Sequence, residues 1–468
     1  MGEQFLDPRD VRFSWALYAN PGVDCDEKRF MFEKMTDCRI VDDRRVRFFY
    51  QEQYAFSLEQ IGTSLTLMPS HIYDLSDPDN PAYDPKATAA DQAEHINKNP
   101  HNKLWVGLGP YRVTQWTQQY VQAERFADAQ GRTLYFDRAN AGYFDVIRWR
   151  YIDDDEVAMN ALENGELDFF DRVKSTDYFG ERTSREAFKK SFYKGYRYLG
   201  MYGFTGWNLY RPQLKDKAVR DAIAHAFDFK EYLRTNYSGL ARQTTGPVPY
   251  GSEGYPTDLE PYPYSPDRAI ELLEEAGWYD RDGDDIADKD GVKLSIEFLY
   301  PSGNDASKTF GTKLQESLKS IGIELRLTTL EWATFLERLK SRDFDGCNLA
   351  WIPPLESDPE QLWHSRLGAR DVRSSNNSGV QDPKVDAMIA GIQAETDTAK
   401  RMKLWQEFHR YIYLEVQPYL FMYNVPYKFA VTREFRGLQS FAIDPGYSLR
   451  RWYYWNPERP GLRKTLDP

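Results

Sequence analysis

The chain has 468 residues, of which 41% are hydrophobic and 15% aromatic, and its formal net charge at pH 7 is -12. This composition supports packed cores and excludes a disordered chain, and the length favours a body of two or three parts. The acidic balance excludes non-specific binding to nucleic acid, because no basic excess is present to neutralise phosphates.

Membrane and export signals are missing from the sequence as given. It contains no run of eighteen apolar residues, and its first residues show no basic segment followed by an apolar one. The sequence therefore predicts neither a membrane-spanning helix nor a secretory signal peptide within this chain.

The three cysteines, Cys25, Cys38 and Cys347, form no CxxC pair. That low, odd count argues against a zinc site and against a thiol nucleophile. Cys25 and Cys38 are close enough in sequence to form a disulfide in an oxidising compartment, and two unpaired thiols are the alternative.

The first hundred residues predict a small mixed unit. Asp7 and Pro8 are typical of the N-cap and first position of a helix, and residues 39–50 alternate as a strand. Residues 77–102 are polar and rich in Asp, Pro and Asn, so we expect an exposed connection there with room for one helix.

The next predicted unit is a strand over 145–151, a helix over 155–164 and a second strand near Phe169. Gly165 is well placed to end the helix, since glycine adopts the left-handed conformation at low cost. As a pattern, strand, helix and strand predict a βαβ crossover.

The stretch 206–240 joins a strand to an amphipathic helix. Trp207 and Asn208 end the strand, Pro212 turns the chain away from the sheet, and Asp216 is a plausible N-cap. The apolar positions of the helix follow one face, as the spacing of Val219, Ala222, Ile223, Ala226 and Phe227 indicates. We expect the strand to leave one body here and the helix to enter another.

From 212 to 425 the pattern alternates between helix and strand. Helices are predicted over 266–276, 308–320 and 331–340, and strands over 294–298, 323–328 and 347–351. Such alternation predicts an α/β lobe with a largely parallel sheet. The apolar run 418–423 is a buried strand that crosses back, and two crossings predict a two-lobed clamp with a hinge.

Several phrases resemble the extracytoplasmic solute-binding proteins of family 5, which serve peptide and nickel ABC importers. They are Gly2 to Trp15, Met68-Pro69-Ser70-His71, Gly107 to Val113, Gly165-Glu166-Leu167-Asp168, Trp207-Asn208 with Arg211 to Leu214, and Val219 to Asp228. In that family the first phrase lies well inside the mature protein. The resemblance therefore also implies that the family's N-terminal portion is missing from this sequence. Either the gene model is truncated, or the chain is a fragment.

The resemblance implies an α/β fold: a two-lobed periplasmic-binding-protein-like clamp of type II, similar to class C, with an extra subdomain in lobe one. On this reading residues 1–104 form the small subdomain, 105–211 lobe one and 212–425 lobe two, and residues 426–468 return to lobe one.

The function implied is the substrate-binding component of an ABC importer, which captures peptides between its lobes and delivers them to membrane permease subunits. The expected protein is a periplasmic or extracytoplasmic, membrane-associated monomer without a cofactor, and it does not bind nucleic acid. An oligosaccharide or another small solute is the alternative ligand, since the 12 Trp and 32 Tyr also suit sugar stacking. A cytosolic enzyme is the alternative of a different class.

The candidate ligand site follows the strand 347–351, because ligands of α/β lobes lie at the carboxyl ends of strands. The predicted ligand-binding residues are Trp351, Pro353, Leu355, Glu356, Asp358, Trp207, Asn208 and Trp363. In peptide-binding relatives an Asp here pairs with the α-ammonium of the peptide, but this sequence has Leu355 at that position. Either Glu356 or Asp358 substitutes, or the ligand has no free amino terminus there. For the three tryptophans, core packing is the alternative role.

The sequence does not support two other types of site. Asp280, Asp282, Asp284 and Asp288 resemble a calcium loop, but Asp285 and Gly291 stand where an EF-hand needs Gly and Glu, which favours an acidic surface turn. The six histidines form no Ser-His-Asp or HExxH pattern, so we predict neither a metal site nor an enzyme.

Overall fold

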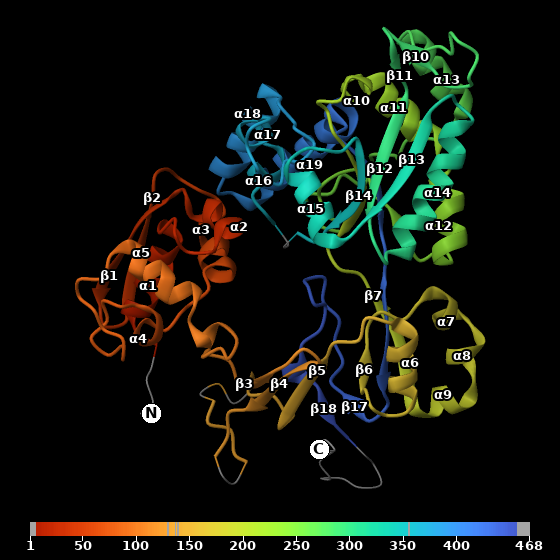
Figure 1. The fold of residues 1–468 in the computed structure, drawn as a ribbon. Helices are drawn as coiled ribbons and strands as arrows, with labels where there is room; N and C mark the ends of the chain where they lie inside the picture. Colours follow the sequence, from red (N-terminus) through yellow and green to blue (C-terminus); the bar gives the residue numbers. More distant parts are fainter. Residues whose placement is uncertain (1–5, 129–130, 136, 138–139, 354–355, 456–468) are drawn as a thin grey trace.

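The computed structural model describes residues 6–128, 131–135, 137, 140–353 and 356–455. Figure 1 shows three bodies: an N-terminal subdomain, a lobe built on two three-stranded sheets (lobe one), and a lobe built on one six-stranded sheet (lobe two). None of the described helices is long and apolar enough to cross a membrane.

The N-terminal subdomain packs helices against a hairpin. Its main elements are α1 (Pro8–Ala19), α2 (Asp26–Arg29), β1 (Met35–Asp42), β2 (Arg45–Tyr50), α3 (Ser57–Glu59), α4 (Ser70–Tyr73) and α5 (Ala89–Asn97). Asp7 caps α1 as predicted, in a capping box with Asp10. The single strand predicted over 39–50 is wrong: Asp42 accepts a hydrogen bond from the amide of Arg44 (3.1 Å), which forms the turn between two antiparallel strands.

Cys25 and Cys38, both within the described residues, are not joined by a disulfide. Cys38 is buried in β1, and burial raises the pKa of its thiol to about 11. Of the two alternatives that the sequence leaves open, the structure therefore has separate thiols.

Lobe one contains two sheets, in the orders β3-β4-β5 and β6-β16-β7. The elements are β3 (Tyr111–Trp116), β4 (Tyr120–Arg125), β5 (Val146–Arg150), α6 (Asp155–Glu163), β6 (Phe169–Phe170), α7 (Ser175–Phe179), α8 (Glu181–Ser184), α9 (Glu186–Ser191), β7 (Phe192–Arg197), β16 (Tyr427–Thr432), β17 (Phe435–Arg436) and β18 (Tyr453–Tyr454). The predicted βαβ crossover is wrong. The strands before and after α6 belong to different sheets, because β6 pairs with β16 from the far end of the chain.

Lobe two is built on the sheet β13-β12-β14-β8-β15-β9. Its strands are β8 (Tyr202–Trp207), β9 (Arg242–Gln243), β12 (Ser295–Pro301), β13 (Glu324–Leu330), β14 (Gly346–Trp351) and β15 (Tyr419–Asn424). Its longer helices are α11 (Lys217–Ala226), α12 (Phe229–Tyr237), α13 (Pro266–Glu275), α14 (Asp305–Lys319), α15 (Trp332–Lys340), α18 (Pro383–Ala394) and α19 (Thr398–Tyr411).

This sheet is mixed rather than largely parallel. β12 pairs in parallel with β13 and β14, whereas β8 pairs antiparallel with both β14 and β15. The chain enters lobe two by β8 and leaves it by β15, and these two strands pair antiparallel with each other. The sequence pattern detected the βαβ part and missed the direction of the strands that connect the lobes.

The first passage between the lobes lies before the stretch 206–240, although the sequence led us to expect it within that stretch. Trp207 at the end of β8 and Ile223 of α11 belong to one hydrophobic core, so this strand and helix do not lie in separate bodies. Residues 198–201 join β7 of lobe one to β8 of lobe two, and residues 425–426 join β15 to β16 (Figure 1). The division at 104, 211 and 425 stays a prediction.

His409 of α19 gives lobe two an expected pH dependence. The ring is fully buried: its Nε2 lies 3.0 Å from Thr245 Oγ1, and its Nδ1 accepts from the amide of Val248 (3.3 Å). Burial, and secondly the charge of Arg410, lower the pKa of His409 to about 3. Because the unfolded chain binds this proton near pH 6.5, the stabilisation is complete above that pH and is lost as the pH falls toward 3.

We therefore expect the free energy of unfolding to fall by about 1.4 kcal/mol per pH unit from this group between those values. The measurement is urea unfolding at pH 7, 5.5 and 4.5 for the wild type and His409→Gln, since other titrations cancel in the difference. His225→Gln, on a half-exposed ring, is the control. Equal pH slopes for the wild type and His409→Gln would contradict this role.

Candidate functional site

The carboxyl end of β14 places part of the predicted site. Trp351 is half-buried, and its ring stacks on Phe204 of the neighbouring strand β8 at 6.3 Å between centroids and 10° between planes. Pro353 is also half-buried, while Leu355 lies outside the described residues. The position where peptide-binding relatives carry an Asp is therefore not placed by the structure.

Glu356 is held by two side chains of α19. Its carboxylate accepts from the guanidinium of Arg401 at 2.5 and 3.0 Å and from the indole Nε1 of Trp405 at 3.1 Å. The carboxylate in turn raises the pKa of Arg401. A bidentate pair of this kind fixes the carboxylate in place and neutralises its charge.

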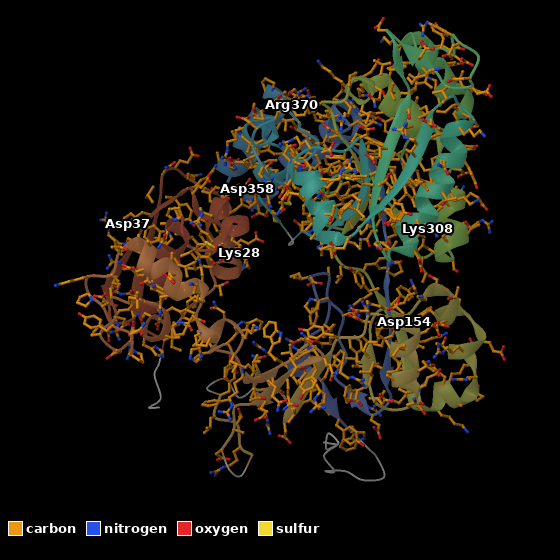
Figure 2. The ribbon with its side chains drawn as sticks, in the orientation of Figure 1. Lys28, Asp37, Asp154, Lys308, Asp358 and Arg370 are labelled. Atoms are coloured by element: carbon orange, nitrogen blue, oxygen red, sulfur yellow. The ribbon has the colours of Figure 1, made fainter. Side chains whose placement is uncertain are left out.

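Asp358 links the N-terminal subdomain to lobe two (Figure 2). Its carboxylate accepts from Tyr54 Oη at 2.6 Å, from Gln393 Nε2 of α18 at 2.9 Å, and from the amide of Glu360 at 2.9 Å. Burial, and secondly the charge of Asp358, raise the pKa of Tyr54. Tyr54 is therefore a neutral donor at physiological pH, as the contact requires.

Further contacts hold the same interface. The amide of Ala55 donates to Gln393 O (2.8 Å), and Lys34 Nζ donates to Gln393 Oε1 (2.7 Å). Tyr54 and Phe56 also join the hydrophobic cluster that contains Trp405 of lobe two. The segment after β14 thus lies against a docked N-terminal subdomain, which the sequence alone did not predict.

A pocket of about 130 Å³ lies at this interface and is lined from both sides. We call it the acidic pocket, because its lining carries five carboxylates and two cations: Glu33, Glu59, Glu356, Asp358 and Glu360, with Lys34 and Arg366. Glu59 comes from α3, and burial followed by the nearby charge of Glu356 raises the pKa of its carboxyl group. The excess of negative charge suits a cationic group of a ligand.

Three predicted ligand residues are buried instead of lining a surface. Trp207 is fully buried and Trp363 is 2% exposed, each within a hydrophobic core of lobe two. Asn208, also buried, donates from Nδ2 to the carbonyls of Arg342 (2.9 Å) and Phe344 (2.8 Å). Packing and a backbone cap account for the position of all three side chains, and their assignment as ligand contacts stays a prediction.

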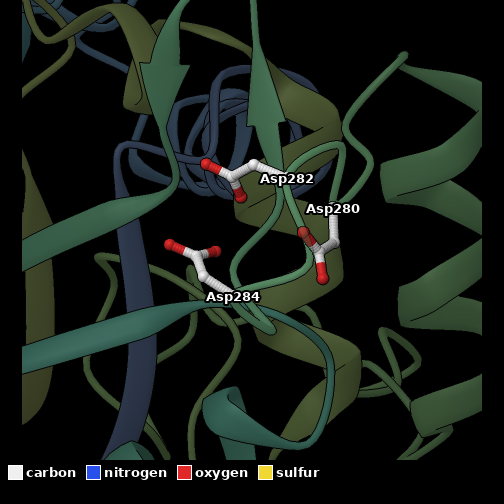
Figure 3. Close-up of side chains that lie close together, drawn as sticks. All are labelled: Asp280, Asp282 and Asp284. Atoms are coloured by element: carbon white, nitrogen blue, oxygen red, sulfur yellow. The ribbon is translucent and has the colours of Figure 1, made fainter.

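The carboxylates of the calcium-like turn form hydrogen bonds and ion pairs with other groups of the same chain. Figure 3 shows Asp280, Asp282 and Asp284 close together, with carboxylate oxygens within 4.8 Å of one another. Lys293 Nζ bonds Asp282 (2.6 Å) and Asp284 (2.7 Å), Asp280 accepts from the amide of Gly283 (2.7 Å), and Asp288 pairs with Arg281 (3.2 Å). This geometry fits the acidic surface turn that the sequence favours.

The residues that the sequence missed are Tyr54, Glu59, Gln393, Arg401 and Trp405. They lie on other helices and on the N-terminal subdomain, and no motif marks them. Tyr54 and Glu59 come near Asp358 and Glu356 only when the N-terminal subdomain docks. Gln393, Arg401 and Trp405 reach the same carboxylates through packing within lobe two.

We expect Asp358→Asn to destabilise the docked subdomain. The amide keeps the shape but loses the charge that three donors share, and we expect a loss of about 1–3 kcal/mol. Hydrogen exchange at the Ala55 amide, which bonds across the interface, measures the docking locally. Asp43→Asn, on an exposed turn, is the matched control and should change stability by less than about 0.5 kcal/mol. Unchanged exchange at Ala55 in Asp358→Asn would show that Asp358 does not hold the subdomain.

The family model described as "Bacterial extracellular solute-binding proteins, family 5 Middle" matches residues 4–371. The oligopeptide-binding protein AppA of Bacillus subtilis is 28% identical over 365 residues, which are 76% of this chain and 64% of that protein. The chain therefore spans less than two thirds of the length of this relative.

Solved structures share the fold. AppA from Bacillus subtilis in complex with a nonapeptide has a TM-score of 0.79 at 24% identity, covering 97% of this chain and 84% of that chain. NikZ from Campylobacter jejuni in complex with Ni(L-His) has a TM-score of 0.77 at 20% identity, covering 95% and 84%. These similarities confirm the predicted two-lobed α/β clamp.

Proposed function

Because the chain belongs to the bacterial extracellular solute-binding proteins of family 5, we propose that it is the substrate-binding component of an ABC importer. It captures a peptide between its two lobes and delivers it to permease subunits at the membrane. The observation that carries this proposal is the similarity to an oligopeptide-binding protein over 76% of the chain.

The mechanism is capture by closure. The two short connections between the lobes, residues 198–201 and 425–426, allow a hinge motion, and a ligand that contacts both lobes favours the closed state. The closed form then docks on the permease. No covalent step and no cofactor are needed for this capture, so the protein acts as a carrier and not as an enzyme. It works as a monomer, in the periplasm or another extracytoplasmic space.

The acidic pocket is the proposed position for the amino terminus of the peptide. An α-ammonium placed beside Glu59 gains a charge-assisted hydrogen bond in a partly dry site, next to the Glu356–Arg401 pair. Trp351 and Pro353, at the end of β14, contact the peptide backbone and side chains. This assignment accounts for Leu355 at the position where relatives carry an Asp, because Glu59 of α3 supplies the carboxylate instead.

A small solute other than a peptide is the second candidate. It is supported by the shared fold with NikZ, which was solved in complex with Ni(L-His). An oligosaccharide belongs to the same alternative, since aromatic side chains stack on sugar rings.

A thermal-shift comparison tests the ligand class. At a concentration of one hundred times Kd, a bound ligand stabilises the folded state by about 2.7 kcal/mol, so a bound peptide raises the Tm. We expect short peptides with a free amino terminus to raise the Tm more than their N-acetylated forms, and oligosaccharides to leave it unchanged.

The Glu59→Gln variant provides the matched test of the acidic pocket. It should reduce the preference for the free amino terminus, while Glu52→Gln on the exposed chain outside that pocket should keep it. Stabilisation by oligosaccharides alone would replace the peptide by the second candidate, and turnover of any substrate would overturn the carrier function.

A further inference from the structure

A second pocket lies in lobe one, and its lining shares no residue with the acidic pocket. It has a volume of about 400 Å³ and lies between the β6-β16-β7 sheet and the segment 435–452. Six aromatic side chains line it: Phe169, Tyr193, Phe429, Phe435, Tyr447 and Trp452. We call it the aromatic pocket. Its volume suits a small organic molecule, and its rings suit a flat one.

The charge of the aromatic pocket is positive. Arg197, Arg433 and Arg436 line it, and no carboxylate occurs among its lining residues in the described chain. This is a local exception on a protein whose net charge is -12. A pocket with only one sign of charge concentrates ligands of the opposite sign.

The three arginines have different roles. Arg197 is 4% exposed, pairs with Asp171 (3.1 Å) and donates to the carbonyl of Pro445 (2.9 Å). Its guanidinium group therefore has a structural role. Arg433 and Arg436 are exposed, and the hydrogen bonds of their guanidinium groups go to backbone carbonyls.

Arg433 and Arg436 thus have no carboxylate partner among the described residues. Glu434, which lies between them in sequence, instead accepts from Tyr454 Oη (3.0 Å). No carboxylate of the described chain therefore pairs with either guanidinium group at the wall of the pocket.

We propose that the aromatic pocket binds a small aromatic carboxylate. The flat body of the ligand stacks against the rings, and its carboxylate pairs with Arg433 and Arg436, for which guanidinium groups are well suited. This site is independent of the ligand carried between the lobes and does not rest on the proposed function.

Isothermal titration of the full chain with two matched probes tests the proposal. Indole-3-acetate has a flat body and a carboxylate, and indole-3-acetamide has the same body without the charge. We expect the acetate to bind about ten- to a hundredfold more tightly than the amide, the effect of one or two charged hydrogen bonds.

The variants separate charge from stacking. The double variant Arg433→Gln, Arg436→Gln should weaken acetate binding by a similar factor, and Tyr193→Ala should weaken the acetate and the amide alike. Arg450→Gln removes an exposed arginine of the same segment outside the pocket lining and should leave acetate binding unchanged. Arg436→Gln alone is the fallback if the double variant does not fold, which circular dichroism reports.

Three results would overturn the proposal: no binding of the acetate at millimolar concentration, equal binding of acetate and amide, or binding that the arginine variants leave unchanged. Peptide binding, measured by thermal shift on the same samples, should not respond to these variants. A failure of the aromatic pocket is therefore distinguishable from a failure of the carrier function.

Discussion

Replacing Arg220 with leucine is expected to cost the folded protein about 3–5 kcal/mol, because several buried carbonyls lose their donor at once. The side chain is 5% exposed and donates to the carbonyls of Leu214 (2.5 Å), Lys215 (3.0 Å), Val416 (2.9 Å) and Gln417 (3.0 Å). Burial lowers the pKa of Arg220 to about 10, which leaves the guanidinium charged at neutral pH.

These bonds tie α11 to the chain just before β15, and β15 and β8 are the strands that connect the lobes. The loss should therefore appear both in urea unfolding and as faster hydrogen exchange in β15. Arg234→Leu is the control, since Arg234 is exposed and pairs with Glu231 on its own helix. A loss below about 1 kcal/mol would mean that water or other donors replace the guanidinium.

The second large effect is expected at Trp207. Its side chain is fully buried against α11 and the central strands, so Trp207→Ala should cost about 3–5 kcal/mol through lost burial and the cavity left behind. Trp332→Ala is the matched control: Trp332 is 51% exposed, and we expect a change of less than about 1 kcal/mol.

The variants Trp207→Ala and Trp332→Ala also test whether Trp207 packs in the core or contacts the ligand. If Trp207 only packs, the variant should bind peptide with unchanged affinity at a temperature where it remains folded. A variant that keeps its stability but loses peptide binding would restore the original interpretation of Trp207 as a ligand residue.

Local features could be predicted from the sequence. Asp7 and Asp216 each cap a helix at the predicted position, with the side chain accepting from a backbone amide of the first turn. Gly165 and Gly277 follow helix ends with φ of +77° and +83°. These signals depend on residues within a few positions of one another, and so short segments contain them completely.

Strand pairing could not be predicted in the same way. The sequence predicts the strands around α6 correctly as strands, but β6 pairs with β16, more than two hundred residues away. A pattern of alternating apolar residues gives the faces of a strand and contains nothing about its neighbour or its direction. For the same reason, the strand directions in the mixed sheet of lobe two could not be predicted from the sequence.

The candidate site shows this division most clearly. Its position after β14, and Glu356 and Asp358 within it, follow from the sequence. The partners of these residues are distant: Tyr54 lies 304 positions from Asp358, and Arg401 lies 45 positions from Glu356. Docking of the N-terminal subdomain brings Tyr54 to Asp358, and the packing of α19 within lobe two brings Arg401 to Glu356.

By itself, then, the sequence determined where several helices begin, that the chain is a two-lobed α/β clamp, and the family to which it belongs. The tertiary structure decided which tryptophans are core, which carboxylates are already paired, and where the chain passes between the lobes. The physical reason is that caps and periodicity are local properties of the chain, whereas burial and charge pairing depend on contacts between distant segments that form only when the bodies pack.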